Sequence, residues 1–159
     1  MMNKLWYLPV SMLLITGCAT THVQDSNNLG TKGLLICQPA ELCPVLTVVW
    51  NETHKDVLKV KISLNDAHTS YNIQKVVFTN GEKSLPFNVT GPTEIDRPFK
   101  ANRSRNSVLV PVNLVAQLGG SSSILMNIHT DKGVISRHIV KDDVKAPVFQ
   151  ELVKYYKAD

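Results

Sequence analysis

The feature that most limits the fold is a strict alternation of apolar and polar residues between Asp56 and Asn65. The apolar set is Leu58, Val60, Ile62 and Leu64, and the polar set between them is Lys59, Lys61 and Ser63. Successive side chains of a strand point to opposite faces, so this pattern predicts a strand with one buried and one solvated face. Such strands are typical of antiparallel sheets.

Further segments are rich in β-branched and apolar residues, and turn residues separate them, which predicts more strands. They are residues 34–37, 44–51, 71–79, 82–89, 107–112, 122–130 and 134–141. Asn80 and Gly81 predict a type I′ hairpin turn, and Gly133 predicts a left-handed residue closing a second hairpin, whose register stays open. Pro86 cannot donate to a strand ladder, so its strand is expected at a sheet edge.

Two short helices complete the predicted elements. Asn113 is a candidate N-cap for a helix ending near Leu118, and Asp142 or Asp143 is a candidate cap for a C-terminal helix. That helix is expected to dock through Phe149, Leu152, Val153 and Tyr156, which share one face. The expected fold class is α+β, with an antiparallel sheet or a β-sandwich carrying the short helix and the C-terminal helix.

The N-terminal segment has the pattern of a removable signal. Lys4 precedes an apolar run of about 11 residues ending at Ile15. A helix of that length spans only ~16 Å, against ~30 Å for a bilayer core. A signal peptide at residues 1–17 is therefore expected rather than a permanent membrane span.

The run closes on Ile15, Thr16, Gly17 and Cys18, which resembles the lipobox of bacterial lipoproteins. The resemblance covers the first 18 residues only, and the mature part suggests no family. It implies cleavage before Cys18, attachment of lipid to the Cys18 thiol, and a membrane anchor of two or three acyl chains. The alternative is an ordinary secretory signal with a chance cysteine. Ala19 in place of aspartate implies the outer membrane, with the domain facing the periplasm.

After the anchor, residues 18–33 are expected to be a flexible tether, and residues 34–159 a single globular domain. The alternative for the tether is an ordered arm lying on the domain. Removing residues 1–17 takes away one lysine and no acid, which leaves 16 basic and 13 acidic residues. This balance is too weak to predict nucleic-acid binding.

If Cys18 carries lipid, Cys37 and Cys43 remain as an even pair in an oxidising compartment, which predicts a disulfide. Their spacing does not match a zinc site, and no metal or cofactor is expected.

Residues 93–107 are predicted to be a long polar loop that contains Arg97, Lys100, Arg103 and Arg105. These four cations form a candidate docking surface for head-group phosphates, an acidic glycan or an acidic protein. The alternative is a solvated loop with no partner.

No catalytic signature accompanies these features. The glycine-serine run from Gly119 lacks the order of a nucleophile elbow, and the five histidines predict neither a metal site nor acid–base chemistry. The leading hypothesis is therefore a non-enzymatic outer-membrane lipoprotein that acts as an interaction, accessory or assembly component for another envelope protein. The alternative is a periplasmic ligand-binding, glycan-binding or hydrolase-inhibitor module.

The lipobox resemblance generates the first test, the intact mass of the chain extracted from membranes. The mass is expected to exceed that of residues 18–159 by two or three acyl chains. Cys18→Ala is expected to leave an uncleaved or mislocalised chain. A soluble product cut at another position would refute the anchor.

Overall fold

The computed structural model describes residues 28–51, 53–118 and 122–155. The predictions for Cys18, Gly119 and Tyr156 lie outside these residues. The strands are β1 (Asn28–Leu34), β2 (Val45–Asn51), β3 (His54–Asp66), β4 (Ile73–Thr79), β5 (Ser84–Asn88), β6 (Glu94–Asp96), β7 (Asn102–Pro111), β8 (Ile124–Thr130), β9 (Gly133–Lys141) and β10 (Val144–Lys145). The helical elements are η1 (Pro98–Lys100), α1 (Leu114–Gln117) and α2 (Pro147–Tyr155).

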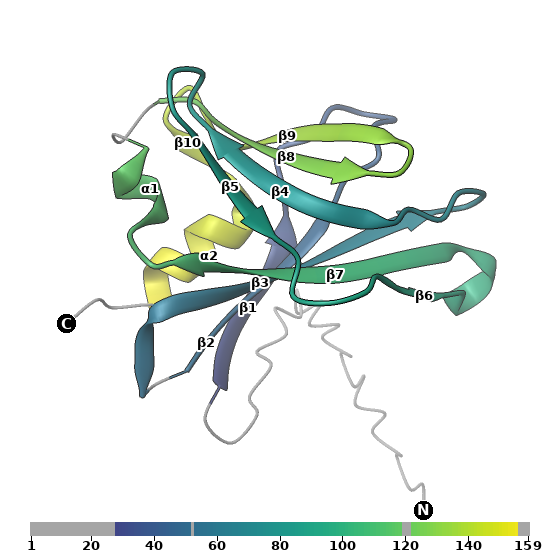
Figure 1. Cartoon of the computed structure of the whole chain (residues 1–159). Coiled ribbons are helices and arrows are strands. Elements are labelled where there is room, and N and C mark those ends of the chain that lie inside the picture. The colour runs from purple at the N-terminus through teal and green to yellow at the C-terminus, as the bar shows by residue number, and fades with distance from the viewer. Residues whose placement is uncertain (1–27, 52, 119–121, 156–159) are drawn as a thin grey trace, which may run out of the picture.

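The strands form two antiparallel five-stranded sheets (Figure 1). Sheet A has the order β1-β2-β3-β7-β6, and sheet B has the order β10-β9-β8-β4-β5. The mainly antiparallel architecture with two short α-helices agrees with the expected class. Among the described residues, no helix is long and apolar enough to cross a membrane.

The alternation predicted from Asp56 to Asn65 is confirmed in β3, the central strand of sheet A. Its apolar set is at most 5% exposed, whereas Lys59 and Lys61 face outward. One core cluster joins these residues to others from sheet B, such as Phe78 and Ile128. Burying an aliphatic or aromatic side chain contributes about 1.5–3 kcal/mol, so the cluster is the main term that stabilises both sheets.

Sheet B confirms two further expectations. The strand that contains Pro86 is β5, at an edge of the sheet, where a missing N–H costs little. The hairpin of β8 and β9 closes with Thr130 paired to Gly133, which has φ of 120°. Its register pairs His129 with Val134 and His138 with Leu125, so the two histidines are not opposite each other.

The boundary between tether and domain was predicted too late. β1 begins at Asn28, so residues 28–33 of the predicted tether are paired with β2. The predicted strand at residues 34–37 is also misplaced, because β1 ends at Leu34 and Ile36 forms only an isolated bridge to His138. The reason is a tertiary contact. Residues 28–33 have little apolar pattern of their own, but the strongly β-forming strand β2 provides backbone hydrogen-bond partners along their length.

A glycine in β1 lets helix α2 approach sheet A. A Cβ built at Gly33 would lie 2.8 Å from the backbone nitrogen of Val148, which is too close for any other residue without a shift. Thr31 of the same strand donates a hydrogen bond through its hydroxyl to the Val148 carbonyl. The N-terminal end of α2 is thus held against β1, with Ala146 and Val148 fully buried.

The turn predictions were partly wrong. Asp142 and Asp143 do not cap α2; both have positive φ, 50° and 65°, in the two-residue turn between β9 and β10. That is the type I′ requirement, which aspartate tolerates better than most residues. At Asn80 and Gly81 only the glycine has positive φ, because the loop has four residues between paired Thr79 and Ser84.

The helix predictions also needed correction. α2 begins at Pro147, where a proline needs no hydrogen-bond partner. Asn113 occupies the N-cap of α1, but its side chain makes no capping hydrogen bond. Phe149 is partly buried against the core, whereas the side chains of Leu152 and Val153 lie outside the described residues.

Docking of α2 can be tested at Val148, whose side chain is 0% exposed. Val148→Asp would bury a charge, so we expect a loss of several kcal/mol, about 3 to 5, in the free energy of unfolding. The matched control is Val144→Asp, because Val144 is 58% exposed. Chemical denaturation measures both. Equal denaturation midpoints for Val148→Asp and Val144→Asp would show that packing of α2 does not stabilise the core.

Candidate functional site

The region predicted as a polar loop at residues 93–107 is instead mostly a hairpin of β6 and β7. The loop prediction failed because polar residues fill both faces of this part of β7. Asn102 and Ser104 are buried on the inner side, so the apolar alternation that marks a strand is missing. The four predicted cations are consequently divided, with Arg103 and Arg105 on β7 and Arg97 and Lys100 at the η1 turn.

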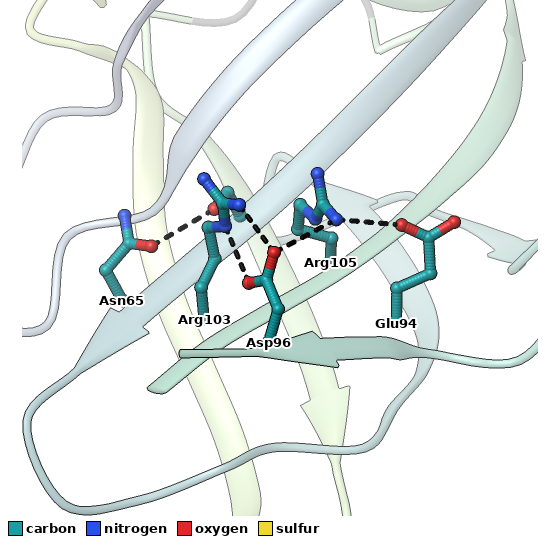
Figure 2. A network of polar contacts seen from close by, with 6 residues as sticks. Asn65, Glu94, Asp96, Arg103 and Arg105 are labelled. Carbon is teal, nitrogen blue, oxygen red and sulfur yellow. Dashed lines mark hydrogen bonds and ion pairs between the residues drawn. The ribbon is translucent and has the colours of Figure 1, made fainter. Parts of the chain in front are cut away.

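Arg103 and Arg105 are both paired with acids of β6, as Figure 2 shows. Arg103 donates to both carboxylate oxygens of Asp96, through Nε at 2.8 Å and through Nη2 at 2.5 Å. Arg105 lies 3.3 Å from Asp96 and 3.2 Å from Glu94. These ion pairs give the two arginines a structural role in closing the hairpin, which sequence reasoning had not assigned to them.

The Arg103 guanidinium, through its hydrogen bonds, holds the pKa of Asp96 below its ordinary value. The same pairing raises the pKa of Arg103. Asp96 is therefore a fixed anion at neutral pH rather than a general acid or base. The Nε of Arg105 is buried and has no hydrogen-bond partner within the part of the chain that the structure describes.

The η1 turn projects an aromatic side chain into solvent. Phe99 and Lys100 have positive φ, 52° and 68°, a conformation that costs non-glycine residues about 1–2 kcal/mol each. The Phe99 side chain is fully exposed. Arg97 is tied to the start of β7 through a 2.7 Å hydrogen bond from its Nε to Asn102. Folding alone gives no reason for an exposed phenyl ring on a strained turn.

The sheet register brings further cations to the outer face of sheet A. Lys32 of β1 is paired with Thr47 of β2, which is paired with Lys61 of β3. Lys59 lies two residues before Lys61 on the same face of β3. Ser63 lies two residues after Lys61 and is paired with Arg105 of β7. These four cations and Arg103 therefore lie together on this face, beside the acids Glu94 and Asp96. Among the described residues no ion pair neutralises the three lysines.

A groove of about 840 Å³ lies over this face. Its floor consists of outward side chains of β2, β3 and β7, among them Thr47, Lys61 and Ser63. Residues 90–92 line one part, and Pro98 and Phe99 of the η1 turn line another. Asn106 donates through its side-chain amide to the Gly91 carbonyl at 3.0 Å, so the 90–92 segment is held to β7.

The four cations predicted as a docking surface do not all lie at this groove. Arg103 and Arg105 line the groove, whereas Arg97 and Lys100 do not. The groove residues that were not predicted are Lys32, Lys59 and Lys61. The sequence pattern could have indicated some of them. The alternation of β3 had already placed Lys59 and Lys61 on the solvated face, but only the pairing of β1, β2 and β7 with that strand brings the other cations beside them.

The predicted cysteine pair is at disulfide distance. The Cα atoms of Cys37 and Cys43 are 5.8 Å apart, and their sulfur atoms are bonded. Arg137 of β9 anchors the bridged loop, because its Nε donates to the Leu42 carbonyl at 3.1 Å and lies 3.4 Å from Glu41. The loop is therefore held to β9 of sheet B.

The remaining candidates for chemistry stay separate. Within the described part of the chain, no group of three or more histidine, cysteine or acidic residues is placed to hold a metal ion. His138 Nδ1 lies 3.5 Å from Ser123 Oγ, at the outer limit of a hydrogen bond. Comparison of the chain with protein-family models, curated proteins and solved structures found no match.

The Asp96–Arg103 pair generates a titration test by NMR of the carboxyl carbon. The Asp96 pKa is expected below its ordinary value, and Arg103→Gln is expected to raise it, because the cation that stabilises the carboxylate is removed. Because folding lowers the pKa of this carboxyl group, its ionised form stabilises the fold at pH values above the ordinary pKa. This stabilisation is lost as the pH falls through the pKa of the folded protein. The hairpin should therefore loosen only in acid.

Asp131 is the internal control for that titration. Its pKa is lowered mainly by a hydrogen bond from the Asn72 backbone, so Arg103→Gln should not move it. An Asp96 pKa unchanged by Arg103→Gln would mean that the ion pair does not persist in solution.

Proposed function

We propose that the chain is a lipid-anchored, non-enzymatic protein of the bacterial outer membrane that works by binding an anionic partner on the outer face of sheet A. The observation that carries the binding role is the cationic groove, in which three lysines form no ion pair with any acid in the described part of the chain. Unneutralised charges on one sheet face repel one another, so an external anion is the simplest reason for their arrangement.

The anchor and location rest on the sequence. The motif ending in Cys18 supports lipidation and an outer-membrane address with the domain in the periplasm. A bonded Cys37–Cys43 pair is compatible with that oxidising compartment. In the proposed molecule the two sheets pack face to face as a β-sandwich, so that sheet A presents its polar face to solvent.

Binding is favoured over catalysis by the chemistry of the groove. Its charged residues are lysines and arginines with acids locked in ion pairs, and Asp96 is held ionised by Arg103. A general acid or base needs a pKa near the working pH, which a depressed carboxyl pKa does not provide. The groove can attract and orient an anion without transferring a proton.

A second candidate is an interface with another envelope protein, the hypothesis that led the sequence analysis. It is favoured by exposed apolar side chains on the same sheet face, namely Leu34 at 47%, Val57 at 38% and Leu109 at 52%. Such residues beside a charged region are typical of docking surfaces. In this alternative the acidic partner would be a folded protein that covers the whole face of sheet A.

Photocrosslinking in cells tests the proposed binding face. A photoreactive residue at Thr47, in the groove, is expected to give an adduct, and the double change Lys59→Gln and Lys61→Gln is expected to reduce it roughly tenfold. The same probe at exposed Gln74 of β4 is the control. Equal yields at the two positions, or an adduct at Thr47 that ignores the lysine changes, would refute this binding face.

A further inference from the structure

We propose that the groove on the outer face of sheet A binds a saccharide that carries at least two phosphate groups. This inference rests on the proposed function and names the ligand class of the same site. The size of the groove favours a compact ligand. Its volume of about 840 Å³ falls within the ~300–1,000 Å³ that is usual for small-ligand sites.

The type of cation favours phosphate over a protein surface. Three of the five groove cations are lysines, which are depleted in protein–protein interfaces but are common phosphate ligands. A planar carboxylate is matched best by the guanidinium group of arginine. The guanidinium group of Arg103 is already bound to Asp96 through its Nε and Nη2 atoms. Lys32, Lys59 and Lys61 are therefore the charges that a ligand would meet.

The number and spread of the lysines favour more than one anionic group. Lys59 and Lys61 are two residues apart on one strand, which separates them by about 7 Å. Lys32 and Lys61 stand two strand positions apart across Thr47, which separates them by about 10 Å. A phosphate monoester carries a charge of about −1.5 to −2 at neutral pH, which is less than the combined charge of the three lysines, whereas two phosphates on one sugar framework balance that charge.

The remaining lining suits the sugar framework. The hydroxyls of Thr47 and Ser63 lie among the lysines and can exchange hydrogen bonds with sugar hydroxyls. Phe99 lines the same groove with a fully exposed ring, on a turn that holds it in positive φ. The C–H face of a pyranose packs well on an aromatic ring, which gives this exposed side chain a role.

Calorimetric titration of the full chain in detergent tests the proposal, with glucose 1,6-bisphosphate as the probe. We expect saturable binding that weakens with added salt, since screening reduces the attraction between lysine and phosphate. Lys32→Gln and Lys61→Gln are each expected to weaken binding roughly tenfold, the loss of one charge-assisted contact. Lys75→Gln removes an exposed lysine of β4 outside the groove and should leave the affinity unchanged.

The sugar is tested separately with inorganic pyrophosphate, which has two phosphates and no saccharide. Phe99→Ala is expected to weaken binding of glucose 1,6-bisphosphate several-fold but to leave pyrophosphate binding unchanged. Val134→Ala, at an exposed apolar residue of β9, should change neither. Equal effects of Phe99→Ala on both probes would overturn the saccharide assignment.

Two further probes identify the source of the ligand and the competing class. Mixed micelles that carry lipid A present a bisphosphorylated disaccharide as a head group, and tighter binding to them than to the soluble sugar supports a lipid-borne source. Binding to the soluble sugar alone supports a free one. Preference for a hexaglutamate peptide, or equal binding to phosphatidylglycerol micelles, overturns the proposed ligand and leaves an anionic binding face intact.

Absence of binding to every probe also overturns the ligand class. The crosslink at Thr47 distinguishes that outcome from failure of the proposed function, because it reports occupancy of the groove in cells whatever the occupant is. A lysine-dependent crosslink with no binding of the phosphorylated sugars would retain the function and reject the saccharide.

Discussion

The pairing of β3 with β7 is the constraint on which the rest of the structure depends. It runs over the full length of β7, from Val57 opposite Pro111 to Asp66 opposite Asn102. One side of the pair supplies apolar residues to the core, and the other side becomes the floor of the groove. Side chains of a strand alternate between the two faces, so a shift of one residue in the pairing register would exchange the buried and exposed sets. Burial of the apolar set in the core therefore also determines which side chains line the groove.

The fold was accessible from sequence wherever burial produced a clean local pattern. The alternation of β3, the β-branched run of β2 and the edge position of Pro86 each followed from the residues themselves. Prediction failed where partners supplied what the local sequence lacked. β1 obtains its ladder from β2 and is covered by α2, and neither contact has a signature within residues 28–33.

The site was less accessible, because its charges come from strands that are distant in sequence. A cluster of cations within residues 97–105 was visible, but two of them are engaged with acids that lie only a few residues away. The lysines that remain unpaired within the described chain belong to β1 and β3 and meet only through the sheet register. Charge density along a sequence is therefore a weaker guide to a binding surface than charge arrangement across a sheet.

The position of β1 has a mechanical consequence. A chain held by lipid at Cys18 would transmit any pull to the domain through the start of β1, at Asn28. Force along a strand that is paired over seven residues loads its ladder in shear, the direction in which the hydrogen bonds resist together. Lys32 lies on that same strand, so tension on the anchor and occupancy of the groove would act on one element. A bridging ligand would then lock the loaded strand to its neighbours.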